Sequence, residues 1–147
     1  MEDTKRRLLW HGMFLFLLGL LTGFLEQKFS NPRMGLAAHL EGLMNGIFLL
    51  ALGAVWQEVR LSARYKGVAY WLALLGTYGN WVVTSLAAAL GTGALSPITA
   101  AGHSAPPWQE TAVSLGFVFV GLTIIGCSVF VLWGLRRNAQ PVAPVAS

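Results

Sequence analysis

Four long runs of apolar residues, separated by short polar stretches, are the main pattern along this chain. They cover about residues 8–25, 34–55, 68–95 and 112–135. A helix of roughly 18 residues rises about 27 Å, which is close to the thickness of the hydrocarbon layer of a bilayer. Backbone polar groups must be paired inside lipid, so runs of this length predict membrane-spanning helices. The predicted fold class is therefore all-α, an integral membrane four-helix bundle.

The same pattern predicts a single folded unit. Residues 1–137 form one four-span membrane domain, and the tail at 138–147, rich in Pro, Val and Ala, is predicted to be disordered. Pro32 suits the first turn of the second helix, where its missing N–H would be unpaired anyway. The third run is rich in Gly and Ala, which lets helices approach closely in lipid. We expect the third helix to be central.

Composition and charge support a membrane protein. The chain is 55% hydrophobic and 11% charged, outside the range of a soluble domain. Its net charge of +4 comes from basic residues that flank the apolar runs, as orientation signals do, so we expect no nucleic-acid partner. The distribution of Lys and Arg places both termini in the cytoplasm, for a multi-pass protein of the bacterial inner membrane. With Cys127 as the only cysteine, no intrachain disulfide or paired-cysteine metal site is possible.

Three polar side chains interrupt the second apolar run. His39, Glu41 and Asn45 fall within seven residues, and each loses several kcal/mol of hydration in hydrocarbon unless it is partnered. Intramembrane ionisable groups therefore indicate a functional site. Two alternatives stay open: His39 is a core histidine bound to Glu41 or a carbonyl, and Glu41 is an interfacial carboxylate.

The histidine pattern favours haem over a bare metal ion. A zinc site needs three or four protein ligands, whereas haem supplies four nitrogens and needs one axial imidazole. Counted along the helices, His39 lies about 24 Å from the cytoplasmic ends and His11 about 5 Å. The two cannot share a metal within one subunit, and His11 is interpreted as an interfacial side chain beside Trp10.

Three segments carry a resemblance to a known family. The sequences are FLFLLGLLTG, then NPRMGLAAHLEGLMNG, then GTYGN in the third run. The chain resembles the hydroxylaminobenzene mutases, which are small membrane isomerases, and more distantly the styrene oxide isomerases. The specific part is His-x5-Asn-Gly, from His39 to Gly46, together with Asn80; the resemblance covers most of residues 8–135.

That resemblance implies a cofactor and an assembly. Styrene oxide isomerases are four-helix membrane trimers that hold ferric haem b between subunits through a histidine matching His39, with asparagines matching Asn45 and Asn80 near the substrate. The expected metal ligand is therefore His39, and the expected catalytic residues are Asn45 and Asn80. Those enzymes have a tyrosine where this chain has Thr84, which favours the mutase branch over epoxide chemistry.

Neighbouring residues complete the expected site. Gly42 and Gly46 share the helix face of His39, and their missing side chains would leave a flat cofactor-binding surface. Asn45 lies about 120° away, so His39 of one subunit and Asn45 of another could face one pocket. Four residues are expected to contact a small aromatic substrate: Glu41, Tyr78, Trp81 and Thr84. For Trp81, core packing or lipid contact stays open.

The resemblance and the residues together predict an isomerase. It would convert an arylhydroxylamine, hydroxylaminobenzene, to the ortho-aminophenol with ferric haem as a Lewis acid. The alternatives are an epoxide isomerase and a non-catalytic membrane haem protein for electron transfer. The electron carrier would need a second axial ligand, and His103 is the candidate nearest in depth.

Overall fold

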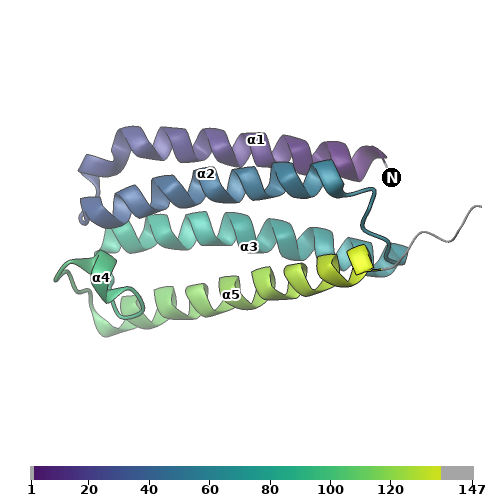
Figure 1. Cartoon of the computed structure of the whole chain (residues 1–147). Coiled ribbons are helices and arrows are strands. Elements are labelled where there is room, and N and C mark those ends of the chain that lie inside the picture. The colour runs from purple at the N-terminus through teal and green to yellow at the C-terminus, as the bar shows by residue number, and fades with distance from the viewer. Residues whose placement is uncertain (1, 137–147) are drawn as a thin grey trace, which may run out of the picture.

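The computed structural model describes residues 2–136 and contains only helices and loops within that range. Its four long helices are α1 (Glu2–Leu25), α2 (Pro32–Val55), α3 (Ala63–Leu90) and α5 (Pro107–Arg136) (Figure 1). Two short helices, η1 (Glu26–Lys28) and α4 (Pro97–Ala100), lie in the connections. All four long helices are long and apolar enough to cross a membrane, which confirms the predicted all-α membrane fold. The tail at 138–147 lies outside the described residues.

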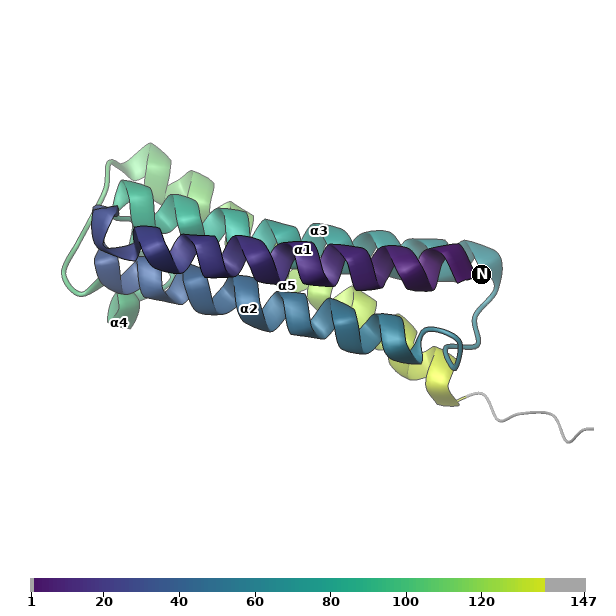
Figure 2. The ribbon, with the colours of Figure 1, turned by 90° about the horizontal axis from the view of Figure 1, so that it is seen from above.

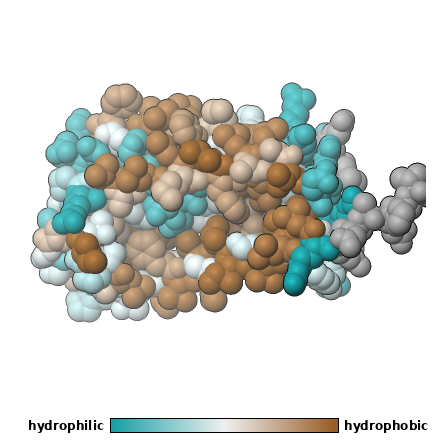
Figure 3. Space-filling model, in the orientation of Figure 1, coloured by the Kyte–Doolittle hydropathy of each residue, from teal (hydrophilic) through white to brown (hydrophobic). Residues whose placement is uncertain are grey.

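The long helices pack in chain order. α1 lies along α2, α2 along α3, and α3 along α5, as Figures 1 and 2 show from two directions. Within the described range the backbone of α5 runs close to α3 and to no other long helix, although α5 is the most apolar of the four. The space-filling view is brown along its middle and teal at its ends (Figure 3), which suits a chain surrounded by lipid. α3 lies between α2 and α5, as predicted from its small residues.

Glycines set the close contact between α1 and α2. A Cβ atom placed on Gly42 would overlap the Cα of Gly19, and one on Gly46 would lie 2.8 Å from the carbonyl oxygen of Gly12. The two backbones touch at these positions, where lipid offers no hydrophobic drive to bring helices together. α1 therefore covers the surface that Gly42 and Gly46 were predicted to present to a cofactor.

The start of α2 is built by Asn31 and Pro32. The Oδ1 of Asn31 accepts a hydrogen bond from the backbone N–H of Met34 at 3.1 Å, and Pro32 occupies the first turn as predicted. Asn31 is 1% exposed, and its amide also donates to the carbonyl oxygens of Thr99 (3.1 Å) and Ala100 (3.0 Å). One side chain thus caps α2 and fastens α4 beside it.

The third helix begins and ends about five residues before the apolar run that predicted it. α3 ends at Leu90, whereas the run continues to residue 95. The reason is Gly91, which adopts a left-handed conformation with φ of 72° while its N–H donates to the carbonyl of Ala87 at 2.9 Å. Hydropathy could not detect this end, because apolar residues continue into the loop.

Candidate active site

The carboxylate of Glu41 joins the two asparagines that the sequence singled out. Its Oε2 accepts one hydrogen bond from Nδ2 of Asn45 at 3.1 Å and another from Nδ2 of Asn80. Glu41 and Asn45 lie one turn apart on α2, and Asn80 reaches them from α3. A carboxylate can only accept and an amide nitrogen can only donate, so this arrangement fixes which way both amides face. Their carbonyl oxygens remain available as acceptors for another group.

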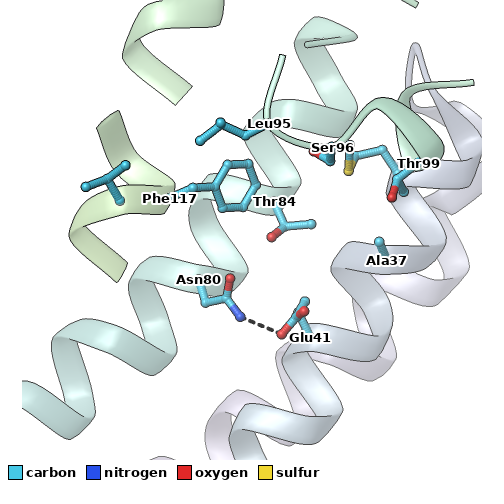
Figure 4. A pocket seen from close by; sticks show the side chains of 10 residues that line it. Ala37, Glu41, Asn80, Thr84, Leu95, Ser96, Thr99 and Phe117 are labelled. Carbon is cyan, nitrogen blue, oxygen red and sulfur yellow. Dashed lines mark hydrogen bonds between the residues drawn. The ribbon is translucent and has the colours of Figure 1, made fainter. Parts of the chain in front are cut away.

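A cavity of about 450 Å³ lies beside this cluster. α2, α3, α5 and the segment around α4 line it and leave it open on one side, and Figure 4 shows Asn80 and Glu41 pointing toward each other at its wall. Its volume is within the usual range for small-molecule sites. The residues that line it are Met34, Ala37, Glu41, Asn80, Thr84, Leu95, Ser96, Thr99, Phe117 and Val118. Half of these residues are polar: Glu41, Asn80 and Thr84 come from α2 and α3, and Ser96 and Thr99 from the segment around α4.

The loop between α3 and α5 forms one end of the cavity. Its Ser96 and Thr99 line the space, and the carboxylate of Glu110 in the first turn of α5 holds the loop from the opposite side. That carboxylate accepts backbone N–H groups on both sides of α4, from Gly93 at 3.0 Å, Ala94 at 2.9 Å and Ala105 at 3.1 Å. With Asn31 bound to α4 as well, the loop is a fixed wall.

Sequence reasoning missed these wall residues. Ser96, Thr99 and Phe117 carry no pattern that separates them from ordinary loop or helix residues. Two signals could have found the residues that hold the loop: Asn31 stands directly before a proline at a helix start, and Glu110 falls in the first turn of the last helix. Both are residue types that bind free backbone N–H groups.

His39 lies on another face of α2, away from this cavity. Its Nδ1 donates to the carbonyl oxygen of Gly19 at 2.8 Å, and a Cβ placed on Gly23 would lie 2.7 Å from the same nitrogen. The imidazole therefore rests on α1 and is half-buried. Positions 39 and 41 are about 200° apart around a helix, which accounts for the separation. Of the partners considered from sequence, the structure gives a carbonyl and not Glu41.

The surroundings of His39 fit an axial haem ligand. Because Nδ1 is the donor, Nε2 carries the lone pair, and a backbone carbonyl behind the ring is a common way to orient a metal-binding imidazole. In the part of the chain that the structure describes, His, Cys, Asp and Glu form no group of three or more that could hold a bare ion. A cofactor that brings its own four nitrogens needs only this one side chain.

Two predicted substrate contacts point elsewhere. The hydroxyl of Tyr78 lies 3.0 Å from Nδ1 of His11, and the indole nitrogen of Trp81 donates to the hydroxyl of Thr22 at 3.1 Å. Both side chains reach from α3 to α1, and neither lines the cavity. Substrate contact by Tyr78 and Trp81 therefore stays a prediction, and in this structure both side chains join α3 to α1. His11, expected at the interface with water, is half-buried in this contact.

Thr84 lines the same cavity as Glu41 and Asn80. It is 4% exposed and lies one turn beyond Asn80 on α3. Its hydroxyl is small, so it leaves open a space that a larger side chain would fill. The predicted site residues therefore fall into two groups: Glu41, Asn80 and Thr84 at the cavity with Asn45 behind them, and His39 on the far side of α2.

Comparison with known proteins gives three matches that cover the four long helices. The family described as styrene oxide isomerase matches residues 4–136. Hydroxylaminobenzene mutase HabB of Ectopseudomonas oleovorans is 46% identical over 132 residues, which are 89% of this chain and 80% of the relative. Hydroxylaminobenzene mutase HabA of the same organism is 39% identical over 127 residues, 86% of this chain and 94% of the relative. No solved structure matches the chain.

Proposed function

Because the chain belongs to the styrene oxide isomerase family it is an isomerase, and we propose that it converts hydroxylaminobenzene to 2-aminophenol. The observation that carries this proposal is the Glu41–Asn45–Asn80 network at the wall of the cavity. A hydroxylaminoarene has one small polar head on an apolar ring. The cavity places the Glu41–Asn80 pair within reach of apolar side chains such as Phe117, so it could hold both parts of such a molecule.

The reaction moves an oxygen atom without net redox change. The N–O bond breaks, the oxygen bonds to the ortho carbon, and the hydrogen lost from that carbon is balanced by one gained at nitrogen. Asn80 is placed to bind the polar head, and Asn45 positions the Glu41 carboxylate. The fixed negative charge of Glu41 would stabilise positive charge that develops on the ring. Apolar walls such as Phe117 exclude water, which would otherwise attack the para carbon.

We propose ferric haem b as the cofactor, with Nε2 of His39 as its axial ligand. When bound, it would supply a Lewis acid that draws electron density from the hydroxylamino oxygen. His39 faces away from the cavity of its own chain, so the proposal places His39 of one copy beside the cavity of a neighbouring copy. This requires a homo-oligomer, and the resemblance implies a trimer.

We also propose the bacterial inner membrane as the location, with both termini in the cytoplasm. Basic residues are more frequent where α1 begins and around the α2–α3 connection than in the α1–α2 connection. Cytoplasmic loops carry such an excess of Lys and Arg. The apolar substrate would then reach the cavity from the lipid.

An epoxide isomerase is the second candidate, because the matching family is described by that activity. Thr84 argues for the mutase, since it replaces the tyrosine of styrene oxide isomerases. The electron-carrier alternative has less support, because both curated relatives are named as mutases.

The test is a paired assay on the purified full-length protein, without added reductant, oxidant or nicotinamide. Hydroxylaminobenzene and styrene oxide are supplied separately, and 2-aminophenol and phenylacetaldehyde are quantified by chromatography. We expect 2-aminophenol from the first substrate, with a large loss in Asn80→Ala and none in Gln57→Ala, an exposed amide outside the site. Turnover of styrene oxide alone would assign the epoxide reaction, and turnover of neither would overturn both candidates.

A further inference from the structure

A second cavity lies at the opposite end of the helices from α4. It has a volume of about 300 Å³ and lies between the start of α1 and the start of α3. Thr4 and Arg7 reach it from α1, and its other lining residues are Trp56, Ala63, Lys66, Gly67, Tyr70 and Trp71. None of these is a residue of the proposed active site. No carboxylate lines the cavity, so its two cations face a space without a negative charge.

One of the two cations is held at the cavity by a neighbouring ring. The ammonium of Lys66 lies 5.8 Å from the ring centroid of Trp56, and this ring is 2% exposed. Arg7 lies one turn after Thr4, which adds a hydroxyl on the same side of α1. A guanidinium, an ammonium and a hydroxyl are the donors that proteins use for phosphate groups.

The position of the cavity selects a lipid over a soluble anion. It lies where α1 begins, at one of the two ends at which teal residues gather in Figure 3. Trp71 lines it and is 61% exposed, as tryptophans at the level of lipid headgroups are. A Cβ placed on Gly67 would meet no atom within 4 Å, so the wall is open at that position. A phosphate could enter here while its acyl chains stay in the apolar band.

We propose that this cavity binds the phosphate of an anionic glycerophospholipid headgroup, with Arg7 and Lys66 as the principal ligands. Two cations without a carboxylate favour a net negative headgroup such as phosphatidylglycerol over a zwitterionic one such as phosphatidylcholine. The site is independent of the isomerase reaction, because no residue in it lines the active-site cavity.

The test is native mass spectrometry of the full-length protein titrated with phosphatidylglycerol, and separately with phosphatidylcholine. We expect saturable binding of phosphatidylglycerol, and Arg7→Gln and Lys66→Gln should each weaken it by roughly tenfold. A basic residue that is merely near an anionic membrane surface contributes roughly fivefold, so a larger loss indicates a direct ligand. The control is Arg64→Gln, an exposed basic residue two positions before Lys66 that does not line the cavity. It should weaken binding less than about twofold.

A steric variant tests the cavity without changing any charge. Gly67→Leu should fill the open wall and weaken phosphatidylglycerol binding, whereas Gly121→Leu, which also enters open space, should not. Either variant should leave the isomerase activity unchanged, which checks that the protein is folded. Equal losses in Arg64→Gln and Lys66→Gln, or unchanged binding in Gly67→Leu, would overturn the proposal. Millimolar inorganic phosphate is added as a competitor. If it displaces bound phosphatidylglycerol, and if Arg7→Gln and Lys66→Gln both weaken its binding, the site binds soluble phosphate and the lipid assignment is overturned.

Discussion

The imidazole of His39 donates from Nδ1 to the backbone carbonyl oxygen of Gly19 across 2.8 Å. A carbonyl can only accept, so the contact fixes the tautomer and leaves the lone pair on Nε2. The acceptor belongs to α1, whereas His39 belongs to α2. Helix packing between α1 and α2 therefore sets the direction in which the free lone pair of Nε2 points.

The first prediction concerns cofactor retention. His39→Ala should lose haem while the protein still inserts in the membrane, because insertion depends on the apolar helices and not on this ligand. Haem per protein is measured by the pyridine haemochrome assay on purified protein. His11→Ala should retain haem, since His11 is bound to Tyr78 and not to the His39 region. Full haem occupancy in His39→Ala would end the ligand assignment.

The second prediction tests the packing behind the imidazole. A Cβ on Gly23 would lie 2.7 Å from Nδ1 of His39, so Gly23→Ala should push the ring off its carbonyl partner. Haem affinity should fall roughly 10-fold, which is typical when a metal-binding histidine loses the hydrogen bond that orients its ring. The matched control is Gly121→Ala, where the added methyl enters open space. Equal haem affinity in the two variants would show that the position of His39 does not depend on α1.

Much of this site follows from helical spacing, and the rest depends on how the helices meet. Glu41 and Asn45 are four residues apart, so helical spacing alone brings them together. Spacing does not bring Glu41 to Asn80, because that contact depends on the register between α2 and α3. Gly42 was assigned correctly to one face of α2, but the helical wheel could not say that α1 covers that face. Helix packing is decided by side-chain fit across two helices, which a single sequence does not display.

The third prediction concerns the amides. Asn80→Ala and Asn45→Ala should each lower turnover by roughly 10- to 1000-fold, the range for losing one placed polar contact. Haem content should stay unchanged, because neither amide contacts His39. Turnover is measured with hydroxylaminobenzene against Gln57→Ala as the control. Wild-type rates in both variants would show that the network serves packing between α2 and α3.

The fourth prediction separates helix packing from cofactor binding at Gly42. Gly42→Ala should destabilise even the haem-free protein by about 1–3 kcal/mol, because the added Cβ overlaps the backbone of Gly19. Thermal unfolding of the haem-free protein, compared with Gly121→Ala, measures this effect. Unchanged stability combined with loss of haem would restore a direct role of Gly42 in cofactor binding.

The last prediction concerns the oxidation state. The substrate and 2-aminophenol have the same oxidation level, so turnover should need no external electron donor or acceptor. Ferric iron withdraws charge more strongly than ferrous iron, so dithionite should suppress activity and reoxidation should restore it. An anaerobic assay of the ferric and ferrous protein tests both the need for an electron donor and the active oxidation state. Oxygen-labelled water in the same assay reports the source of the product oxygen, and an unlabelled product would indicate that the substrate's own oxygen is transferred without exchange with water. Faster turnover of the ferrous protein, or a strict demand for a reductant, would contradict Lewis-acid catalysis.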